Sequence, residues 1–572
     1  MATPALLRAP WRKVLALLTV CAFGAAACGG DDGGGGSSSD TTAQSGAVTA
    51  TTDPAEADLE PVPGGTLRYG LEADTSTPWT PQNSVCAISC HMIMRTVYDT
   101  LALYDENGDY KPYLAESITP NDDFTEWTIV PRAGVTFHDG TALDAAAICD
   151  NLTRHLASVL TGRALLNVAD EPDGAGPVVS EDGTACVVPM VDPWANFPVY
   201  LSGQIGYIAS PTWLAAVDAD PALATRPVGT GPFVFESYDP GGTFAATKNP
   251  NYWRAGEGLP YLDRVEMRVF VDVQSRTNAL LDGQVDMIHV SNGEFIASLR
   301  DEDSIEMEET DAFGETNYLL LNNRDPVIAD ERVRRALALA TDNESLSRDR
   351  AAGVHPVANG PFSRTQVGYL EDTGYPAFDL AAATDLVAEY EAENGPLTIT
   401  FDTTNDPYNE ETNQLIAANW QAAGIDVNIN TVEQGSFIVN ALTGNFQVFG
   451  WRNHGGVNPD SQRIWWHSET GDLATNPLAL NFGGINDPDV DAQLEILRQT
   501  TDDAEIQAAA EEINRIFAER VYNIWNTWTV WGLAHTPAVH DIQAFTFPDG
   551  SPTIPGAGIA GTHQIVQMWI AQ

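Results

Sequence analysis

The sequence predicts an α/β protein that folds into more than one lobe. Residues 64–572 carry aliphatic and aromatic side chains throughout, and a region of roughly 500 residues exceeds what a single hydrophobic core normally organises. In the later part of this region, segments with strand periodicity alternate with segments with helix periodicity. No fixed-period repeat accompanies the alternation, so a solenoid or propeller is not expected.

The first segment, residues 1–27, has the pattern of a lipoprotein signal peptide. Three basic residues precede an apolar run from Val14 to Ala27 that is shorter than the roughly 20 residues needed to span a bilayer. The run ends in three alanines followed by Cys28, which resembles the lipobox of bacterial lipoproteins. We therefore expect Cys28 to carry lipid at the mature N-terminus. The alternative is an ordinary cleaved signal that leaves a soluble secreted protein.

Residues 28–63 predict a disordered tether. They are rich in Gly, Ser, Thr and acidic residues and show no apolar periodicity, so they cannot bury enough surface to fold. A coil of this kind would hold the folded body close to a membrane surface. We therefore expect an extracytoplasmic protein, anchored by lipid to the cell membrane on its periplasmic or outer face.

The charge balance excludes two classes of partner. The formal net charge is -51 at pH 7, from 28 basic and 79 acidic residues. Such a surface repels the phosphates of nucleic acids and the headgroups of anionic lipids. No nucleic-acid partner is expected, and contact with the membrane is expected through the lipid anchor alone.

Four cysteines remain in the folded region: Cys86, Cys90, Cys149 and Cys186. An even number in an exported protein indicates disulfides, and four cysteines allow three pairings. We favour Cys86–Cys90 with Cys149–Cys186, because a short separation at a turn or helix start can bring two Cα atoms within bridging range. Cys86, Cys90 and His91 could instead hold a metal, but no second ligand cluster of the usual spacing follows, so no metal is expected.

The later part of the chain contains a βαβ unit. Apolar residues alternate with period two at 397–401 and again at 425–429, and residues 410–423 between them have helical spacing. Two strands joined in this way are expected to be parallel, with a right-handed crossover. A third strand is expected from Phe446 to Trp451.

Short motifs in the remaining sequence carry a family resemblance. In chain order they are Tyr98-Asp99-Thr100-Leu101, Trp127 to Thr141, Gly229-Thr230-Gly231-Pro232-Phe233, Asn249-Pro250-Asn251-Tyr252-Trp253, Leu281 to Asp286 and Arg332 to Leu337. In this order they closely resemble the extracellular solute-binding proteins of the peptide/nickel class, family five of the ABC-importer binding proteins. The resemblance spans essentially residues 64–572.

The resemblance implies a two-lobed fold like that of periplasmic binding proteins, of type II and in the large variant that has an extra subdomain in the N-terminal lobe. The expected boundaries are 64–316 for lobe I, about 101–228 for its subdomain, 317–531 for lobe II and 532–572 for the C-terminal return to lobe I. The two crossings between the lobes would form a hinge near Asn317–Leu319 and Trp528–Leu533.

The function implied by the resemblance is solute binding for transport. A monomer without a cofactor would capture a peptide or another small solute between its lobes and deliver it to an ABC permease and ATPase complex. Catalysis is not expected, because the sequence has no Gly-x-Ser-x-Gly elbow, His-Glu-x-x-His pair or Walker loop. An exported enzyme and a sensor or chaperone-like protein that uses the same fold are the alternatives.

The expected binding site lies where the third strand of the later region ends. Ligands of open α/β sheets lie beyond the carboxyl ends of strands, and in the resembling family this strand end contacts the ligand. The candidate residues here are Trp451, Arg452, Asn453, His454, Asn458, Asp460, Trp465 and Trp466. In lobe I they are Trp79 and Asn83, with Gln82 and Ser84 beside them, in the irregular stretch that follows a strand at 66–71.

One departure from the family pattern bears on the ligand. Peptide-binding members commonly place an aspartate at this strand end, where it pairs with the α-amino group, but here the position falls on His454 or Gly455. Asp460 would replace it only if the loop bends differently. Because a buried ammonium group needs a paired charge, the usual peptide mode is weakened. A peptide remains the family default and an oligosaccharide the alternative.

Two kinds of side chain at this strand end suggest how a solute would bind. Arg452 can pair with an anionic group of the ligand, and the tryptophans can stack on a ring or a sugar face. A salt bridge for Arg452 and packing within the lobe for the tryptophans are the alternatives.

Overall fold

The computed structural model describes residues 59–572 except for 75–78, 85, 87, 170–175, 313, 405–406, 454 and 555–561. The predicted signal peptide, its Cys28 and most of the predicted tether therefore lie outside the described residues. Among the residues that are described, no helix combines the length and the apolar character needed to cross a bilayer.

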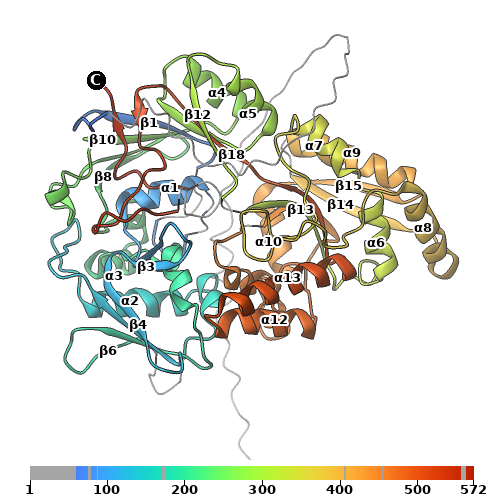
Figure 1. Cartoon of the computed structure of the whole chain (residues 1–572), viewed down its shortest axis with the longest axis horizontal. Helices are drawn as coiled ribbons and strands as arrows, with labels where there is room; N and C mark the ends of the chain where they lie inside the picture. Colours follow the sequence, from blue (N-terminus) through green and yellow to red (C-terminus); the bar gives the residue numbers. More distant parts are fainter. Residues whose placement is uncertain are drawn as a thin grey trace, which may run out of the picture.

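The larger of two main β-sheets has seven strands in the order β12-β18-β11-β1-β10-β9-β8 (Figure 1). These strands are β1 (Thr66–Leu71), β8 (Phe233–Tyr238), β9 (Thr243–Lys248), β10 (Arg264–Val269), β11 (Met287–Val290), β12 (Glu306–Thr310) and β18 (Trp531–His535). β18 lies between β11 and β12, so the chain returns late in the sequence to the sheet in which its described part begins. β1 coincides with the strand that the sequence predicts at 66–71.

The second main sheet has five strands in the order β15-β14-β16-β13-β17. They are β13 (Thr316–Leu321), β14 (Thr398–Thr404), β15 (Asp426–Val432), β16 (Val448–Asn453) and β17 (Asn523–Trp528). The predicted βαβ unit is confirmed, because β14 and β15 are parallel and α9 (Pro407–Ala422) connects them. Figure 1 shows this sheet beside the first, with helices around it.

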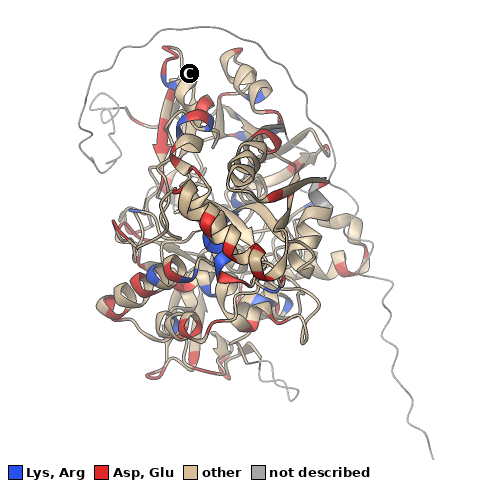
Figure 2. Cartoon of the chain, turned by 90° about the vertical axis from the view of Figure 1, so that its right-hand side faces the viewer, with Lys and Arg blue, Asp and Glu red and all other residues tan. Residues whose placement is uncertain are grey.

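The remaining helices pack around the sheets. They are α1 (Ile88–Val97), α2 (Ala145–Leu156), α3 (Pro211–Ala219), α4 (Val273–Leu281), α5 (Gly293–Arg300), α6 (Glu331–Leu339), α7 (Asn343–Arg350), α8 (Leu380–Asn394), α10 (Gln434–Thr443), α11 (Arg463–Trp466), α12 (Pro488–Gln499) and α13 (Asp503–Arg520). Acidic residues are spread over these helices and the loops, with fewer basic residues among them (Figure 2).

A smaller four-stranded sheet forms a subdomain with its own hydrophobic core. Its order is β4-β5-β7-β6, from β4 (Ala115–Pro120), β5 (Glu126–Pro131), β6 (Val178–Val179) and β7 (Cys186–Pro189), and α2 packs on it. The disulfide Cys149–Cys186 joins α2 to β7, and Cys86–Cys90 closes the turn at the start of α1. The structure therefore contains the two disulfides that the sequence predicts.

Three of the sequence motifs meet at one buried carboxylate, Asp99. It accepts hydrogen bonds from Trp253 Nε1 at 3.0 Å, from Thr230 Oγ1 at 3.0 Å and from the Tyr252 hydroxyl at 3.2 Å. Burial raises the pKa of Asp99, and these donors oppose the shift. The motifs are thus scaffold: they join the end of α1 to the loops around β8 and β9.

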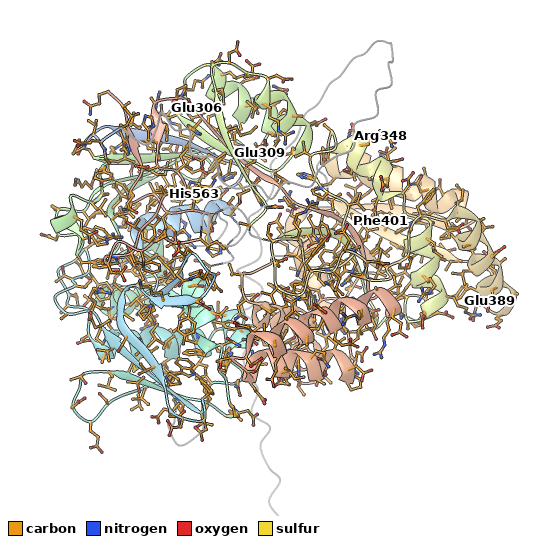
Figure 3. The ribbon with its side chains drawn as sticks, in the orientation of Figure 1. Glu306, Glu309, Arg348, Glu389, Phe401 and His563 are labelled. Atoms are coloured by element: carbon orange, nitrogen blue, oxygen red, sulfur yellow. A yellow bond between two sulfur atoms is a disulfide. The ribbon has the colours of Figure 1, made fainter. Side chains whose placement is uncertain are left out.

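The five-stranded sheet buries Phe401 of β14 between the sheet and its helices, where it stacks on Trp420 of α9 at 5.2 Å (Figure 3). The chain passes between the two main sheets twice, at residues 311–315 and at 529–530. The second crossing lies within the expected Trp528–Leu533. The first precedes Asn317–Leu319, which belongs to β13 because Asn317 pairs with Arg452.

Candidate functional site

The end of β16 lies beside both crossings between the main sheets. Asn453 pairs with Thr316, the first residue of β13, and Thr316 pairs with Trp528, the last residue of β17. In the seven-stranded sheet, Trp531 at the start of β18 pairs with Thr310 at the end of β12. The predicted strand end therefore faces the other sheet.

Arg452 connects the two sheets at this point. Its Nη2 donates to Ser291 Oγ at 3.2 Å, and its Nη1 lies 3.5 Å from Glu315 Oε1. The guanidinium lies 5.8 Å from the ring centroid of Trp531. The side chain of Arg452 is 41% exposed whereas that of Glu315 is 1% exposed, so the cation keeps a solvent-facing side beside a buried carboxylate. This side can pair with an anionic group.

Trp451 points to the opposite face of β16, because successive side chains of a strand alternate. It stacks on Phe437 at 5.6 Å and meets Phe482 edge-on at 5.2 Å, and Trp465 contacts the same Phe482 at 5.6 Å. Trp451, Trp465 and Phe482 are all half-buried, and we call them the aromatic platform. Arg452 and the aromatic platform thus flank the strand end on two sides.

Trp466 and Trp79 are packed inside the protein. Trp466 is buried against Phe362 and Phe517, and Trp79 is buried against Tyr238 and Phe244 in the seven-stranded sheet's core. Asn83 is exposed, and its backbone N–H donates to the Thr80 carbonyl in a turn. Neither tryptophan presents a face to solvent, in keeping with the alternative role in packing.

The loop after β16 uses its polar side chains for contacts within the protein. Asn453 Nδ2 donates to Gln462 Oε1 at 2.8 Å, and Asn458 Oδ1 caps the short helix η7 (Pro459–Gln462). Asp460 is 0% exposed, and its carboxylate accepts from Trp194 Nε1 at 2.9 Å. A ligand ammonium group would have to displace this contact. His454 lies outside the described residues.

Sequence reasoning missed His355, which holds the two sheets together at the second crossing. Its Nε2 donates to the Ser291 carbonyl at 2.8 Å, and its Nδ1 accepts from the Val530 N–H at 3.2 Å. Burial lowers the pKa of His355 to about 4, and the positive charge of Arg452 adds to this while Glu315 opposes it. The imidazole is therefore neutral near pH 7.

Ser291, Glu315 and Trp531 were also missed. No local motif marks these residues, which meet Arg452 only because strands distant in the sequence pair at the crossings. Within the described ranges, no group of three or more His, Cys, Asp or Glu side chains is arranged to hold a metal ion. What the strand end offers a solute is a guanidinium and aromatic faces, which are groups suited to binding.

A family model and several known proteins match more than half of the chain. The family model described as bacterial extracellular solute-binding proteins, family 5 Middle, matches residues 109–474. The glutathione-binding protein GsiB of Pectobacterium atrosepticum is 24% identical over 444 residues, which cover 75% of this chain and 82% of GsiB. Di/tripeptide-binding protein 2 of Pseudomonas aeruginosa is 26% identical over 337 residues, covering 58% of this chain and 62% of the relative.

Solved structures share the architecture over nearly their whole length. The periplasmic binding protein DppA of Helicobacter pylori, in complex with the peptide STSA, has a TM-score of 0.77 at 19% identity and covers 89% of this chain and 99% of its own. AgaA of A. tumefaciens R10, in complex with agropinic acid, has a TM-score of 0.75 at 22% identity with the same coverage. The likeness confirms the predicted two-lobed α/β fold of type II.

Proposed function

The chain belongs to the bacterial extracellular solute-binding proteins of family 5, whose model covers more than half of it, and we propose on this basis that it is the substrate-binding component of an ABC importer. It captures a peptide or another small solute between two hinged lobes and delivers it to a membrane permease with its ATPase. The proposed lobes are residues 64–316 with 532–572, and residues 317–531. A solute closes them only to the extent that it binds the closed form better than the open one.

The observation that carries the proposal is the position of the β16 end. It lies between the two main sheets, beside both crossings, and presents Arg452 on one side and the aromatic platform on the other. Ligands of α/β sheets bind at such strand ends. The candidate site residues are Trp451, Arg452 and Trp465, with Asn83 from the other lobe.

The ligand class we favour is a peptide or another small solute that carries an anionic group. GsiB is named for glutathione and AgaA was solved with agropinic acid, so relatives of one fold differ in ligand. In this chain the Asp460 carboxylate already accepts from Trp194, whereas Arg452 keeps an exposed side. An anion therefore finds a partner at the strand end more readily than an ammonium group does. An oligosaccharide on the aromatic platform is the second candidate.

We further propose a monomeric lipoprotein that is held outside the cytoplasm through Cys28 and performs no catalysis. Proteins of this family are extracellular binding proteins. Steady conversion of a solute by the purified protein would instead indicate an enzyme. Absence of neighbouring permease and ATPase genes would favour a sensor.

A thermal-shift screen of the purified mature protein tests the proposal. The panel contains glutathione, the dipeptide Met-Leu, the tetrapeptide Ser-Thr-Ser-Ala, agropinic acid, a nickel–histidine complex and maltotriose. A solute that binds the folded state raises the melting temperature in proportion to the logarithm of its excess over Kd. We expect at least one anionic solute to do so, and recovery of that solute unchanged after incubation. A panel in which only maltotriose binds would support the sugar alternative.

The variant Trp451→Ala locates the site. Loss of one aromatic contact surface should weaken binding by about tenfold or more, which corresponds to about 1.4 kcal/mol, while the unliganded protein keeps its fold. Titration calorimetry with the solute from the screen measures the affinity, and circular dichroism checks the fold. The matched control is Tyr390→Ala, a half-buried aromatic on α8 that should leave the affinity unchanged. Equal affinity in Trp451→Ala and the unaltered protein would remove Trp451 from the site.

A further inference from the structure

The subdomain touches the second lobe at a place far in sequence from both chain crossings. The contact joins the segment after β7 to η7 and to the C-terminal end of α12, and we call Trp194, Asn196, Asp460 and Arg498 the latch. These four side chains are almost fully buried. The contact is therefore tightly packed, although no chain connection holds the two parts together there.

The first half of the latch is a buried charge pair closed by an indole. Asp460 Oδ2 accepts from Trp194 Nε1 at 2.9 Å, and Arg498 Nε lies 3.4 Å from Asp460 Oδ1. The Arg498 guanidinium also lies 4.1 Å from the Trp194 ring centroid, in cation–π geometry. The pair belongs to the second lobe, and Trp194 of the subdomain covers it. Separation of the parts would leave Asp460 without the indole donor.

The second half of the latch caps a helix across the junction. The last four carbonyls of an α-helix have no partner within the helix. At α12 the subdomain supplies donors: Ala195 N–H donates to the Arg498 carbonyl at 2.8 Å. Asn196 Nδ2 donates to the carbonyls of Leu497 at 2.6 Å and Thr500 at 3.0 Å. The end of α12 is thus completed by the other lobe.

The subdomain holds its half of the latch rigidly. The carbonyl of Trp194 accepts from Trp127 Nε1 at 2.9 Å, and its ring packs edge-on against Phe197 at 5.2 Å and Tyr200 at 4.9 Å. The Tyr200 hydroxyl then donates to the backbone carbonyl of Asp460 at 3.0 Å. The contacts with Trp127, Phe197 and Tyr200 fix the Trp194 ring within the subdomain, so we expect little side-chain ordering of this ring to oppose closure.

We propose that the latch residues are positioning residues that hold the two lobes closed and so set the affinity of the site without touching the solute. The inference rests on the proposed function only where it concerns affinity for a solute. The apparent affinity falls with the fraction of molecules in the binding-competent state. Opening about the two crossings would break the indole bond and the three bonds to the end of α12. The population of closed molecules is then governed by residues remote from the β16 end.

The test compares unliganded protein with Trp194→Phe, Asn196→Ala and the double variant. Trp194→Phe keeps an aromatic ring but removes the Nε1 donor and part of the indole, and Asn196→Ala removes two hydrogen bonds to the end of α12. Each lost bond should lower the closed-to-open ratio about three- to tenfold. We expect a larger radius of gyration in small-angle X-ray scattering, most clearly in the double variant. Hydrogen exchange should become faster in residues 194–202 and at the end of α12.

Two matched controls remove the same groups inside the first lobe. Trp213→Phe loses an indole donor to the Leu223 carbonyl, and Asn151→Ala loses the two hydrogen bonds of its amide to the carbonyls of Ala147 and Ala209. Both should keep the radius of gyration of the unaltered protein. The same radius and the same exchange rates in the latch variants as in the unaltered protein would overturn the proposal. Because neither measurement uses a solute, a failed solute screen would not affect this result.

Discussion

His355 is a single residue whose protonation state depends on the contact between the lobes. Its Nδ1 accepts from Val530 N–H, so a second proton on the ring would break that bond, and burial already lowers its pKa to about 4. An unfolded histidine has a pKa of about 6.5. The unfolded state therefore binds a proton first as the pH falls. His355 stabilises the fold less and less from about pH 6.5 down to about pH 4, below which the effect is constant.

We predict that His355→Gln reduces the loss of stability between pH 7 and pH 5 by about 2 kcal/mol, the value that this shift in pKa gives through linkage. Glutamine keeps a donor and an acceptor but does not titrate. Urea denaturation of both proteins at the two pH values measures the difference. Other buried histidines titrate in both proteins and cancel in the comparison. An equal pH dependence in both would show that His355 carries no such linkage.

At the scale of residues, the sequence predicts the end of β16 better than it predicts the residues that contact this strand end. Trp451 and Arg452 follow from the strand expected up to Trp451, from the rule for strand ends and from the family resemblance. The same sequence does not distinguish Trp451, which keeps an exposed face, from Trp466, which is packed against Phe517. Exposure depends on which elements cover a residue, and that is decided by contacts between segments far apart. Ser291 and His355 could not be predicted for the same reason.

Among the structural elements, the loop that contains Gly231 packs its backbone directly against the end of α1. A Cβ atom at this position would lie 2.5 Å from the carbonyl carbon of Val97, at the end of the helix. The glycine N–H also donates to the Val97 carbonyl, so the loop cannot move away without losing this bond. The glycine-containing motif at 229–233 therefore allows a backbone-to-backbone contact.

We predict that Gly231→Ala lowers the free energy of unfolding by about 1–3 kcal/mol, the range for overpacking in a tight site. Thermal and chemical denaturation measure the loss. Gly256→Ala is the control, because a Cβ atom there meets nothing within 4 Å and its φ is not left-handed. It should change stability by less than about 0.5 kcal/mol. Equal stability of the two variants would contradict the role given to Gly231.

Elements with strong local signals were predicted closely. The strands expected at 397–401 and 425–429 are found as β14 (Thr398–Thr404) and β15 (Asp426–Val432). β16 begins at Val448 instead of Phe446, because the pairing with β13 starts there. The first crossing was placed too late, since β13 already starts at Thr316. Strand limits depend on the partner strand, and the sequence of one segment does not contain that information.

For the whole molecule, the chain length and the alternation of strands with helices predict two lobes. The strand order of the seven-stranded sheet explains why the C-terminal part of the chain returns to the first lobe. The pairing of β18 between β11 and β12 requires the chain to cross back, which produces the second crossing. The latch could not be predicted from the sequence, because it joins the subdomain to α12 and its contacting residues lie about 300 positions apart.

The acidic excess also acts on the molecule as a whole. The chain has 28 basic against 79 acidic residues, and the acidic residues are distributed over the whole cartoon (Figure 2), so their carboxylates repel one another. Salt screens such repulsion, since the Debye length falls from about 30 Å at 0.01 M to about 3 Å at 1 M. Repulsion between like charges destabilises the compact folded state more than the expanded unfolded chain, so screening should stabilise the folded protein. We predict that the melting temperature at pH 7 rises by several degrees between 0.01 M and 1 M sodium chloride.

Scanning calorimetry at a series of salt concentrations measures this rise, and pH supplies the control. Near pH 4 many carboxylates bind a proton, because their ordinary pKa values are about 3.9 and 4.3, so the repulsion and its response to salt should both shrink. A specific effect of the salt on apolar burial would persist at the lower pH. A melting temperature that is constant or falls with salt at pH 7 would mean that attractive pairs, such as those of Arg463 with Glu469 and Glu495, outweigh the repulsion.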